Sequence, residues 1–330
     1  MRWTTFLALL MMVAGFWAGY GLEPALAASS DGDVPTAAQS GQVTLPDTWR
    51  AIRQGEPGFI AGQPQDRGVL IQSEGETWRA ARNGKLTWYA GLALVGVSLA
   101  IGAFYLIRGK IMIEGGPSGR MILRFNRIER IGHWLTAGSF LVLGVTGLNI
   151  MFGRWLLEPI IGKTLFSWLT WAGKWLHNLS GFVFIAGLVV IFALWAKDNL
   201  WDRYDWGWIM HGGGLLKMGD HPPAAKFNFG QKTQFWMVIV VGSLVASTGV
   251  SLLFPFTFAQ LHGMQVMQLI HAGLAVVMVL FILGHIYIGT VGMEGASTAV
   301  TTGYVDLEWA REHHSVWVEE VEGKQTKPAE

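Results

Sequence analysis

Cysteine is absent from this chain of 330 residues. Iron–sulfur clusters are normally held by cysteine thiolates, and c-type haem is attached through cysteine, so both are excluded, together with disulfides and thiolate nucleophiles. A redox cofactor would have to be held by histidine, methionine or noncovalent contacts. Charge is scarce too, at 14% of residues with a net charge of +1. So small a basic excess does not indicate a nucleic-acid-binding protein.

What the chain does contain is hydrophobic: 51% of its residues are apolar and 17 are tryptophan. Five apolar stretches each approach the roughly 20 residues needed to cross a bilayer core. They cover about 87–107, 131–153, 175–196, 233–256 and 266–292. Tryptophan and tyrosine cluster near their ends, as in an interfacial aromatic belt. The sequence therefore predicts an all-α membrane protein, a five-helix transmembrane bundle.

The N-terminus has the pattern of a secretory signal peptide. Arg2 is basic, Phe6–Phe16 is apolar, and Ala25-Leu26-Ala27 is a small-residue cleavage site. An uncleaved anchor helix is the alternative. The predicted domains are a cleavable signal peptide at 1–27, a small periplasmic extension at 28–86, a transmembrane domain at 87–292 and a cytoplasmic tail at 293–330.

Basic residues are distributed unequally among the predicted loops. The 108–130 loop carries Arg108, Lys110, Arg120, Arg124, Arg127 and Arg130, and the 197–232 loop carries Lys197, Arg203, Lys217, Lys226 and Lys232. The 154–174 loop has fewer and the 257–265 loop has none. The positive-inside rule places the two basic loops and the C-terminus in the cytoplasm, which predicts a multi-pass protein of the bacterial inner membrane.

Four of the nine histidines lie within or beside the apolar stretches: His133, His177, His271 and His285. Ionisable residues at such depths are functional candidates. His271 and His285 are 285 − 271 = 14 residues apart on one predicted helix, which separates them by about 21 Å on a similar face. The topology pairs His177 with His271 near the periplasm and His133 with His285 near the cytoplasm. Two imidazoles at each end suit axial ligation of two b haems.

Other interpretations of these residues remain open. A single buried histidine can be a core imidazole bonded to a neighbouring helix, and zinc is the alternative metal, although structural zinc needs one tetrahedral cluster rather than two distant pairs. Glycines on these helices leave room for a flat macrocycle or simply let helices approach. They are Gly132, Gly138, Gly144, Gly147, Gly181, Gly187, Gly273 and Gly284. The other histidines are expected to be solvated or partner-facing: His211, His221, His262 (a possible substitute ligand), His313 and His314.

Several longer motifs surround these positions. They are Arg130-Ile131-Gly132-His133-Trp134, Leu176-His177-Asn178-Leu179-Ser180-Gly181, Ile270-His271-Ala272-Gly273, Gly284-His285-Ile286-Tyr287, Lys226-Phe227-Asn228-Phe229-Gly230-Gln231-Lys232, and Trp309-Ala310-Arg311-Glu312-His313-His314 with Trp317. Over roughly residues 120–320 the chain resembles the gamma, or cytochrome b, subunit of membrane-bound respiratory formate dehydrogenases. The resemblance implies the same pairing of the four histidines as axial ligands of two haem b irons.

The resemblance also implies a quinone site that includes Asn228, Gly230 and Gln231, although Asn228 and Gln231 can instead cap a helix start. The implied partners are an iron–sulfur beta subunit and a molybdenum or tungsten pterin catalytic alpha subunit. Electrons would pass from the periplasm through the haems to quinone in anaerobic respiration, and the chain itself would not catalyse formate oxidation. Alternatives are a cytochrome b subunit of a nickel–iron hydrogenase or thiosulfate reductase, and, from another class, a haem-free histidine-containing proton channel or transporter.

Overall fold

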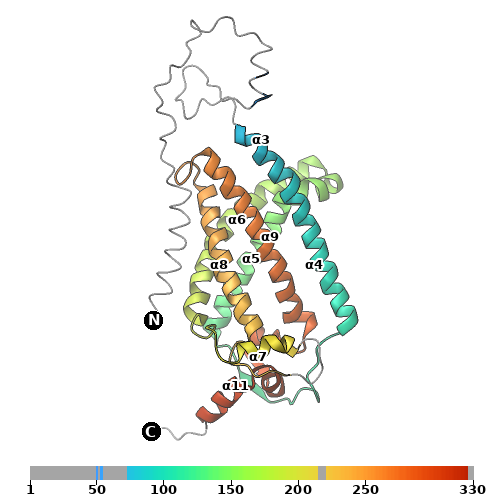
Figure 1. Ribbon diagram of the computed structural model, residues 1–330, viewed down its shortest axis with the longest axis vertical. Coiled ribbons are helices and arrows are strands. Elements are labelled where there is room, and N and C mark those ends of the chain that lie inside the picture. The colour runs from blue at the N-terminus through green and yellow to red at the C-terminus, as the bar shows by residue number, and fades with distance from the viewer. Residues whose placement is uncertain (1–49, 51–52, 55–72, 215–220, 326–330) are drawn as a thin grey trace, which may run out of the picture. The chain divides into compact units, whose positions relative to one another are not determined.

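The computed structural model in Figure 1 describes residues 50, 53–54, 73–214 and 221–325. The predicted signal peptide lies outside the described residues, as does most of the predicted periplasmic extension. The chain divides into two compact units. The larger comprises Ala90–Gly249 and Gly273–Glu330, and the smaller comprises Val250–Ala272 with the described part of Met1–Tyr89.

Five long helices account for most of the described residues. They are α4 (Thr87–Arg108), α5 (Arg127–Leu156), α6 (Glu158–Trp195), α8 (Phe229–Leu253) and α9 (Leu261–Tyr287). Each is long and apolar enough to cross a membrane, which confirms the five predicted spans. Large apolar side chains on these helices stay exposed, and Ile107 is 88% exposed. Such exposure suits contact with lipid and would be unfavourable in water.

The first long helix begins earlier than predicted. A short helix, α3 (Ser73–Ala80), and a π-helical turn, η1 (Ala81–Leu86), lead directly into α4. A continuous helix therefore reaches from Gly75 to Arg108, and it contains the apolar span. Helical structure passes through residue 86, where the predicted extension was expected to end.

Two neighbouring helices, α5 and α6, pack closely against each other. Glycine permits this approach, because a Cβ added at Gly187 would lie 2.6 Å from Thr136 Oγ1 and 2.9 Å from its Cα. A Cβ added at Gly132 would lie 2.9 Å from Val190 Cγ1. For these two glycines the helix-approach interpretation is the one that the packing supports.

The prediction of a loop at 154–174 is wrong, because most of these residues belong to α6. A local break at Gly162, with φ 78° and ψ 161°, divides the first turn of α6 from the rest. Glycine reaches this conformation without the steric cost that a side chain would add. The charges of Lys163 and Lys174 suggested a loop, but the residues between them are largely apolar and continue the helix.

Within the larger unit, the C-terminal segment pairs with the loop that precedes α5. Strand β1 (Met121–Leu123) pairs antiparallel with β2 (Tyr304–Asp306), in the register Met121↔Asp306 and Leu123↔Tyr304. The remaining short elements are α7 (Asp205–Met210), η2 (Gly212–Gly214), η3 (Ile288–Gly292), α10 (Thr298–Thr301) and α11 (Leu307–Gln325). The residues predicted as a tail therefore form ordered structure up to Gln325, and several of them line the large cavity of this unit.

Candidate functional site

Two of the predicted histidines meet inside the larger unit. His133, from α5, and His285, from α9, have ring centres 6.3 Å apart with their planes inclined by 49°. Both line a cavity of about 1000 Å³. His133 Nδ1 is buried and has no hydrogen-bond partner among the described residues. The structure thus brings together one of the two predicted pairs.

This pair fits axial ligation of one metal ion. A metal–imidazole bond is about 2 Å long, and adding about 1 Å from each nitrogen to its ring centre gives a separation of roughly 6 Å between ring centres. Most of the surface that lines the cavity is apolar, and Phe140, Phe184 and Phe281 contribute to it. A Cβ added at Gly284, on the same wall, would meet nothing within 4 Å. A planar apolar cofactor between the two rings suits these surroundings.

His177 is oriented by a neighbouring hydroxyl. Thr146 Oγ1 lies 2.8 Å from His177 Nδ1 and donates its own hydrogen to the carbonyl oxygen of Val142 at 2.7 Å. His177 Nδ1–H therefore donates to Thr146, which places the ring's lone pair on Nε2, the arrangement common among metal-binding histidines. A Cβ added at Gly147 would come within 3.4 Å of the ring. This glycine leaves space for the imidazole.

His271 lies on the same continuous helix as His285, as predicted. It belongs to the smaller compact unit, whereas His177 belongs to the larger one. The pairing of His177 with His271 stays a prediction.

The other glycines on these helices differ in what surrounds them. An added Cβ would meet nothing within 4 Å at Gly138, Gly144, Gly181 and Gly284. Only Gly284 of these lines the cavity. The two interpretations offered by the sequence therefore apply to different glycines, with Gly132 and Gly187 serving helix packing.

Asn228 and Gln231 form a reciprocal cap at the start of α8. Gln231 N donates to Asn228 Oδ1 at 3.0 Å, and Asn228 N donates to Gln231 Oε1 at 3.1 Å. The capping alternative is confirmed, and both residues also line the cavity. The amide nitrogens of both side chains have no hydrogen-bond partner in the part of the chain that the structure describes, so they remain available as donors.

The absence of a side chain at Gly230 allows Trp208 to pack against it. A Cβ added there would lie 2.9 Å from Trp208 Cη2. On a second side, Gly213 adopts φ +66°, and a Cβ there would lie 2.3 Å from Trp208 Cζ2. The indole of Trp208 fits between two glycines, and all three residues line the cavity.

Arg124 is a central residue that the sequence did not single out. Its guanidinium is buried and donates to the carbonyl oxygen of Lys226 at 2.7 Å and to His314 Nε2 at 3.0 Å. The rings of Trp309 and Trp317 lie 5.4 and 5.2 Å from it, within cation–π range. Burial lowers the pKa of Arg124 to about 9, against partial compensation by a nearby glutamate. In the sequence, the only feature that could have pointed to a buried cation here is the pair of tryptophans in the C-terminal motif, Trp309 and Trp317.

His314 corrects one expectation, because it is fully buried rather than solvated. Its Nδ1–H donates to the carbonyl oxygen of Ala225 at 2.8 Å, and its Nε2 accepts from Arg124. Burial, and then the charge of Arg124, lower its pKa well below the ordinary value. The neutral ring joins the C-terminal helix to the segment that precedes α8.

Two lysines of the same segment form ion pairs that sequence analysis missed. Lys226 Nζ lies 2.8 Å from Glu129 Oε1 on α5. Lys232 Nζ lies 2.9 Å from Asp205 Oδ1 on α7 and 2.7 Å from Asp202 Oδ2. The side chains of Lys232 and Asp205 are only 2% and 3% exposed. These pairs attach the start of α8 to α5 and α7.

The remaining histidines differ in surroundings. His211 and His262 are exposed, as predicted. His211 Nδ1 lies 2.8 Å from the carbonyl oxygen of Gly207. His221 and His313 stand together beside Glu312 at the cavity wall, a grouping that the sequence did not suggest.

Comparison with known proteins identifies the family of this chain. Residues 124–302 match the family described as prokaryotic cytochrome b561. The cytochrome b556(fdo) subunit of formate dehydrogenase from Escherichia coli is 31% identical over 214 residues, which cover 63% of this chain and 97% of the relative. The nitrate-inducible cytochrome b556(Fdn) subunit of the same organism is 29% identical over 215 residues, covering 63% and 95%. A formate dehydrogenase cytochrome b556 subunit from Haemophilus influenzae is 26% identical over 206 residues, covering 60% and 83%.

Proposed function

Since this chain belongs to the prokaryotic cytochrome b561 family and to the cytochrome b subunits of formate dehydrogenase, we propose that it carries electrons across the membrane to quinone. The supporting observation is the opposition of His133 and His285, from two helices, at the wall of one large cavity. Haem b is the cofactor of the family, and we propose two per chain.

The protein's part in this function is to hold and insulate the haems, which when bound supply one-electron exchange. His133 and His285 would hold one haem iron through their imidazole nitrogens, and His177 and His271 would hold the other. The apolar wall around the first pair, with Phe140, keeps water from that site. The hydrogen bond from His177 to Thr146 fixes the tautomer that presents Nε2.

Quinone reduction is proposed at the same cavity. Asn228 and Gln231 line it together with His285, and their amide N–H groups are donors suited to the carbonyl oxygens of a quinone. Gly230 contributes by admitting Trp208, which forms part of the wall. Because Asn228 and Gln231 line the same cavity as His285, a quinone bound to them would lie close to the first iron. The electron would then travel only a short distance from that iron to the quinone.

The proposed orientation places this cavity toward the cytoplasm of the bacterial inner membrane, because the basic loops flank it. Electrons would enter from an iron–sulfur subunit and a molybdenum or tungsten pterin subunit on the periplasmic side. Moving each electron inward against the membrane potential costs about 2.3 kcal/mol per 100 mV, which formate oxidation would have to supply. The complex would thereby contribute to the proton-motive force.

The haem proposal is tested by spectroscopy on the purified chain. A reduced-minus-oxidised absorption spectrum should show b-type bands, and extraction should yield two haems per chain. The variant His285→Ala should retain one haem and lose quinone reduction, while His211→Ala, which alters an exposed histidine, should keep both. Two haems in His285→Ala would refute the ligand assignment. Absence of b-type bands in the wild type would instead favour a haem-free channel or transporter.

The partner proposal is tested by purifying the complex from native membranes and identifying its subunits. Co-purification of an iron–sulfur subunit and a molybdopterin or tungstopterin subunit that oxidises formate supports the assignment. Recovery of a nickel–iron hydrogenase or a thiosulfate reductase catalytic subunit would replace formate dehydrogenase with that enzyme.

A further inference from the structure

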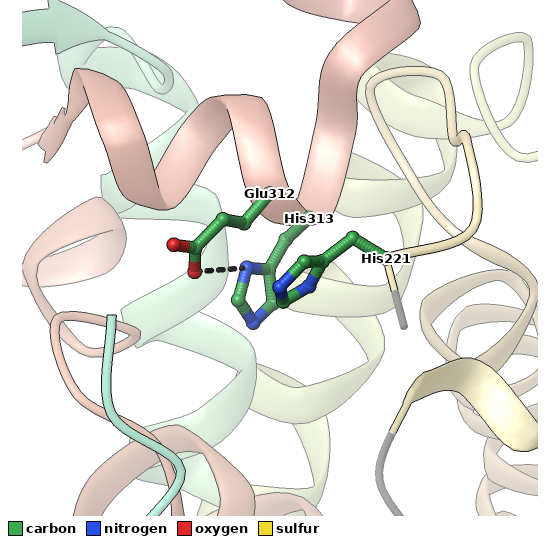
Figure 2. A group of neighbouring side chains, drawn as sticks. All are labelled: His221, Glu312 and His313. Carbon is green, nitrogen blue, oxygen red and sulfur yellow. Dashed lines mark ion pairs between the residues drawn. The ribbon is translucent and has the colours of Figure 1, made fainter. Parts of the chain in front are cut away.

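Three potential metal-binding side chains, none of them a proposed haem ligand, converge on the wall of the large cavity. Figure 2 shows Glu312 and His313 extending from α11 and His221 approaching from the segment before α8. One ligand atom from each side chain lies within 4.8 Å of the other two. From these residues we propose a Zn²⁺ site formed by His221, Glu312 and His313.

The carboxylate of Glu312 has an oxygen without a partner. Oε1 accepts a hydrogen bond from the backbone N–H of Glu114 at 2.8 Å, whereas Oε2 is buried and has no hydrogen-bond partner among the described residues. His313 Nδ1 lies 3.9 Å from Oε2, which is too far for a hydrogen bond. A buried carboxylate oxygen of this kind carries an unpaid desolvation cost, and a cation would remove it.

His313 is held in the tautomer that a metal requires. Its Nδ1 lies 3.1 Å from the carbonyl oxygen of Trp309, so this nitrogen carries the hydrogen and Nε2 carries the lone pair. The ring also stacks on the Trp309 indole, with centres 5.1 Å apart and planes inclined by 10°. A fixed orientation, with the second ring nitrogen hydrogen-bonded to a carbonyl oxygen, is usual for a zinc-binding imidazole.

The donor set favours zinc over other abundant divalent ions. Two imidazole nitrogens and one carboxylate oxygen match known zinc sites with three protein ligands and an open fourth position, whereas Mg²⁺ and Ca²⁺ prefer oxygen ligands. Tetrahedral zinc holds its ligand atoms about 3.4 Å apart, so the present group needs to contract by roughly 1 Å. His221 lies outside any helix or strand. Water or Glu114, whose Oε1 is 3.4 Å from His221 Nε2, can complete the site.

An ion here would cross-link two segments far apart in the chain. His221 and the helix cap at Asn228 belong to one segment, and Glu312 and His313 belong to α11. All these residues line the cavity. Bound zinc would therefore stiffen the wall that carries the proposed quinone donors. Zinc binding itself depends on these side chains and not on haem or quinone.

The test measures Zn²⁺ binding to the full, untagged chain purified in detergent with its haems and treated with a chelator. Competition against a metal indicator should give one Zn²⁺ per chain, and zinc-edge absorption fine structure should show nitrogen and oxygen ligands at about 2.0–2.2 Å. Glu312→Gln, which keeps the side-chain size, and His221→Ala should each weaken binding at least about tenfold. His211→Ala should bind as the wild type does.

Thermal unfolding provides the second measurement. Added Zn²⁺ should raise the Tm of the wild type and of His211→Ala, because a ligand that binds the folded state stabilises it, and should raise the Tm of Glu312→Gln less at the same Zn²⁺ concentration. Helix content and the haem spectrum report whether each variant folds. The proposal would be overturned if the wild type did not bind Zn²⁺, or if folded Glu312→Gln and His221→Ala bound it with the affinity of the wild type. The three side chains would then form a cluster held only by its own hydrogen bonds.

Discussion

Replacing Lys232 with methionine should destabilise the folded chain by about 3–5 kcal/mol, the usual cost of leaving one partner of a buried ion pair unpaired. Lys232 Nζ lies 2.9 Å from both carboxylate oxygens of Asp205, and both side chains are almost fully buried. Methionine keeps most of the apolar stem, so little packing is lost. The cost therefore comes mainly from the stranded carboxylate of Asp205. Asp202 contributes less, because its side chain is 31% exposed and water can replace the lysine there.

The measurement is the free energy of unfolding in mixed detergent micelles titrated with sodium dodecyl sulfate and followed by far-ultraviolet circular dichroism. The double variant Lys232→Met with Asp205→Asn should recover part of the loss, because it removes the stranded charge while an amide oxygen can still accept from the backbone N–H of Asp202. Lys197→Met changes an exposed lysine and should shift the free energy by less than about 0.5 kcal/mol.

Two results would refute this reasoning. One is a loss for Lys232→Met no larger than that for Lys197→Met, which would mean that the pair contributes nothing net. The other is a double variant as unstable as the single one, which would locate the cost somewhere other than the unpaired Asp205.

Three further predictions follow from other contacts. Gly187→Ala places a Cβ against the backbone of α5 and should lower the free energy of unfolding by about 1–3 kcal/mol in the same assay. Gly138→Ala, with open space around it, should be neutral or slightly stabilising. Equal effects of the two substitutions would contradict the packing role of Gly187. Thr146→Val removes the acceptor for His177 Nδ1–H, makes the proposed ligand less basic and should raise the midpoint potential of one haem in a spectroscopic redox titration, so unchanged potentials would count against that ligand. Burial opposes ionisation of Asp306, but hydrogen bonds from backbone N–H groups and a serine hydroxyl hold its pKa below 3.8, so its stabilising effect is complete above that pH and disappears as the pH falls through the folded pKa. Asp306→Asn should consequently lose less stability than the wild type between about pH 5 and pH 2, and parallel pH curves would show that Asp306 contributes nothing.

The membrane helices could be read from the sequence because their signal is local. A bilayer requires about 20 consecutive apolar residues, and each of the five spans satisfies this within its own stretch. The spacing of His271 and His285 is equally local, since one continuous helix carries both. The first part of α6 was missed because Lys163 and Lys174 interrupt the apolar pattern, although the chain on both sides of the break at Gly162 is helical.

The candidate site was predicted only in part. The opposition of His133 and His285 followed from topology, because helix order and direction place their ends together. The roles of Asn228 and Gln231 stayed open in the sequence, and the structure adds a reciprocal helix cap to their place at the cavity. Capping and ligand binding use the same residue types, so composition alone could not separate them.

By itself, the sequence determined that this is a five-span membrane protein without thiolate chemistry and with histidines at two depths. The tertiary structure decided what the basic residues do. Arg124, Lys226 and Lys232 were expected only to orient loops, yet Arg124 contacts His314 across 190 positions and the lysines join Glu129 and Asp205. The same folding gathers His221, Glu312 and His313. Such contacts depend on where distant segments meet, and no periodicity or composition within one segment records that.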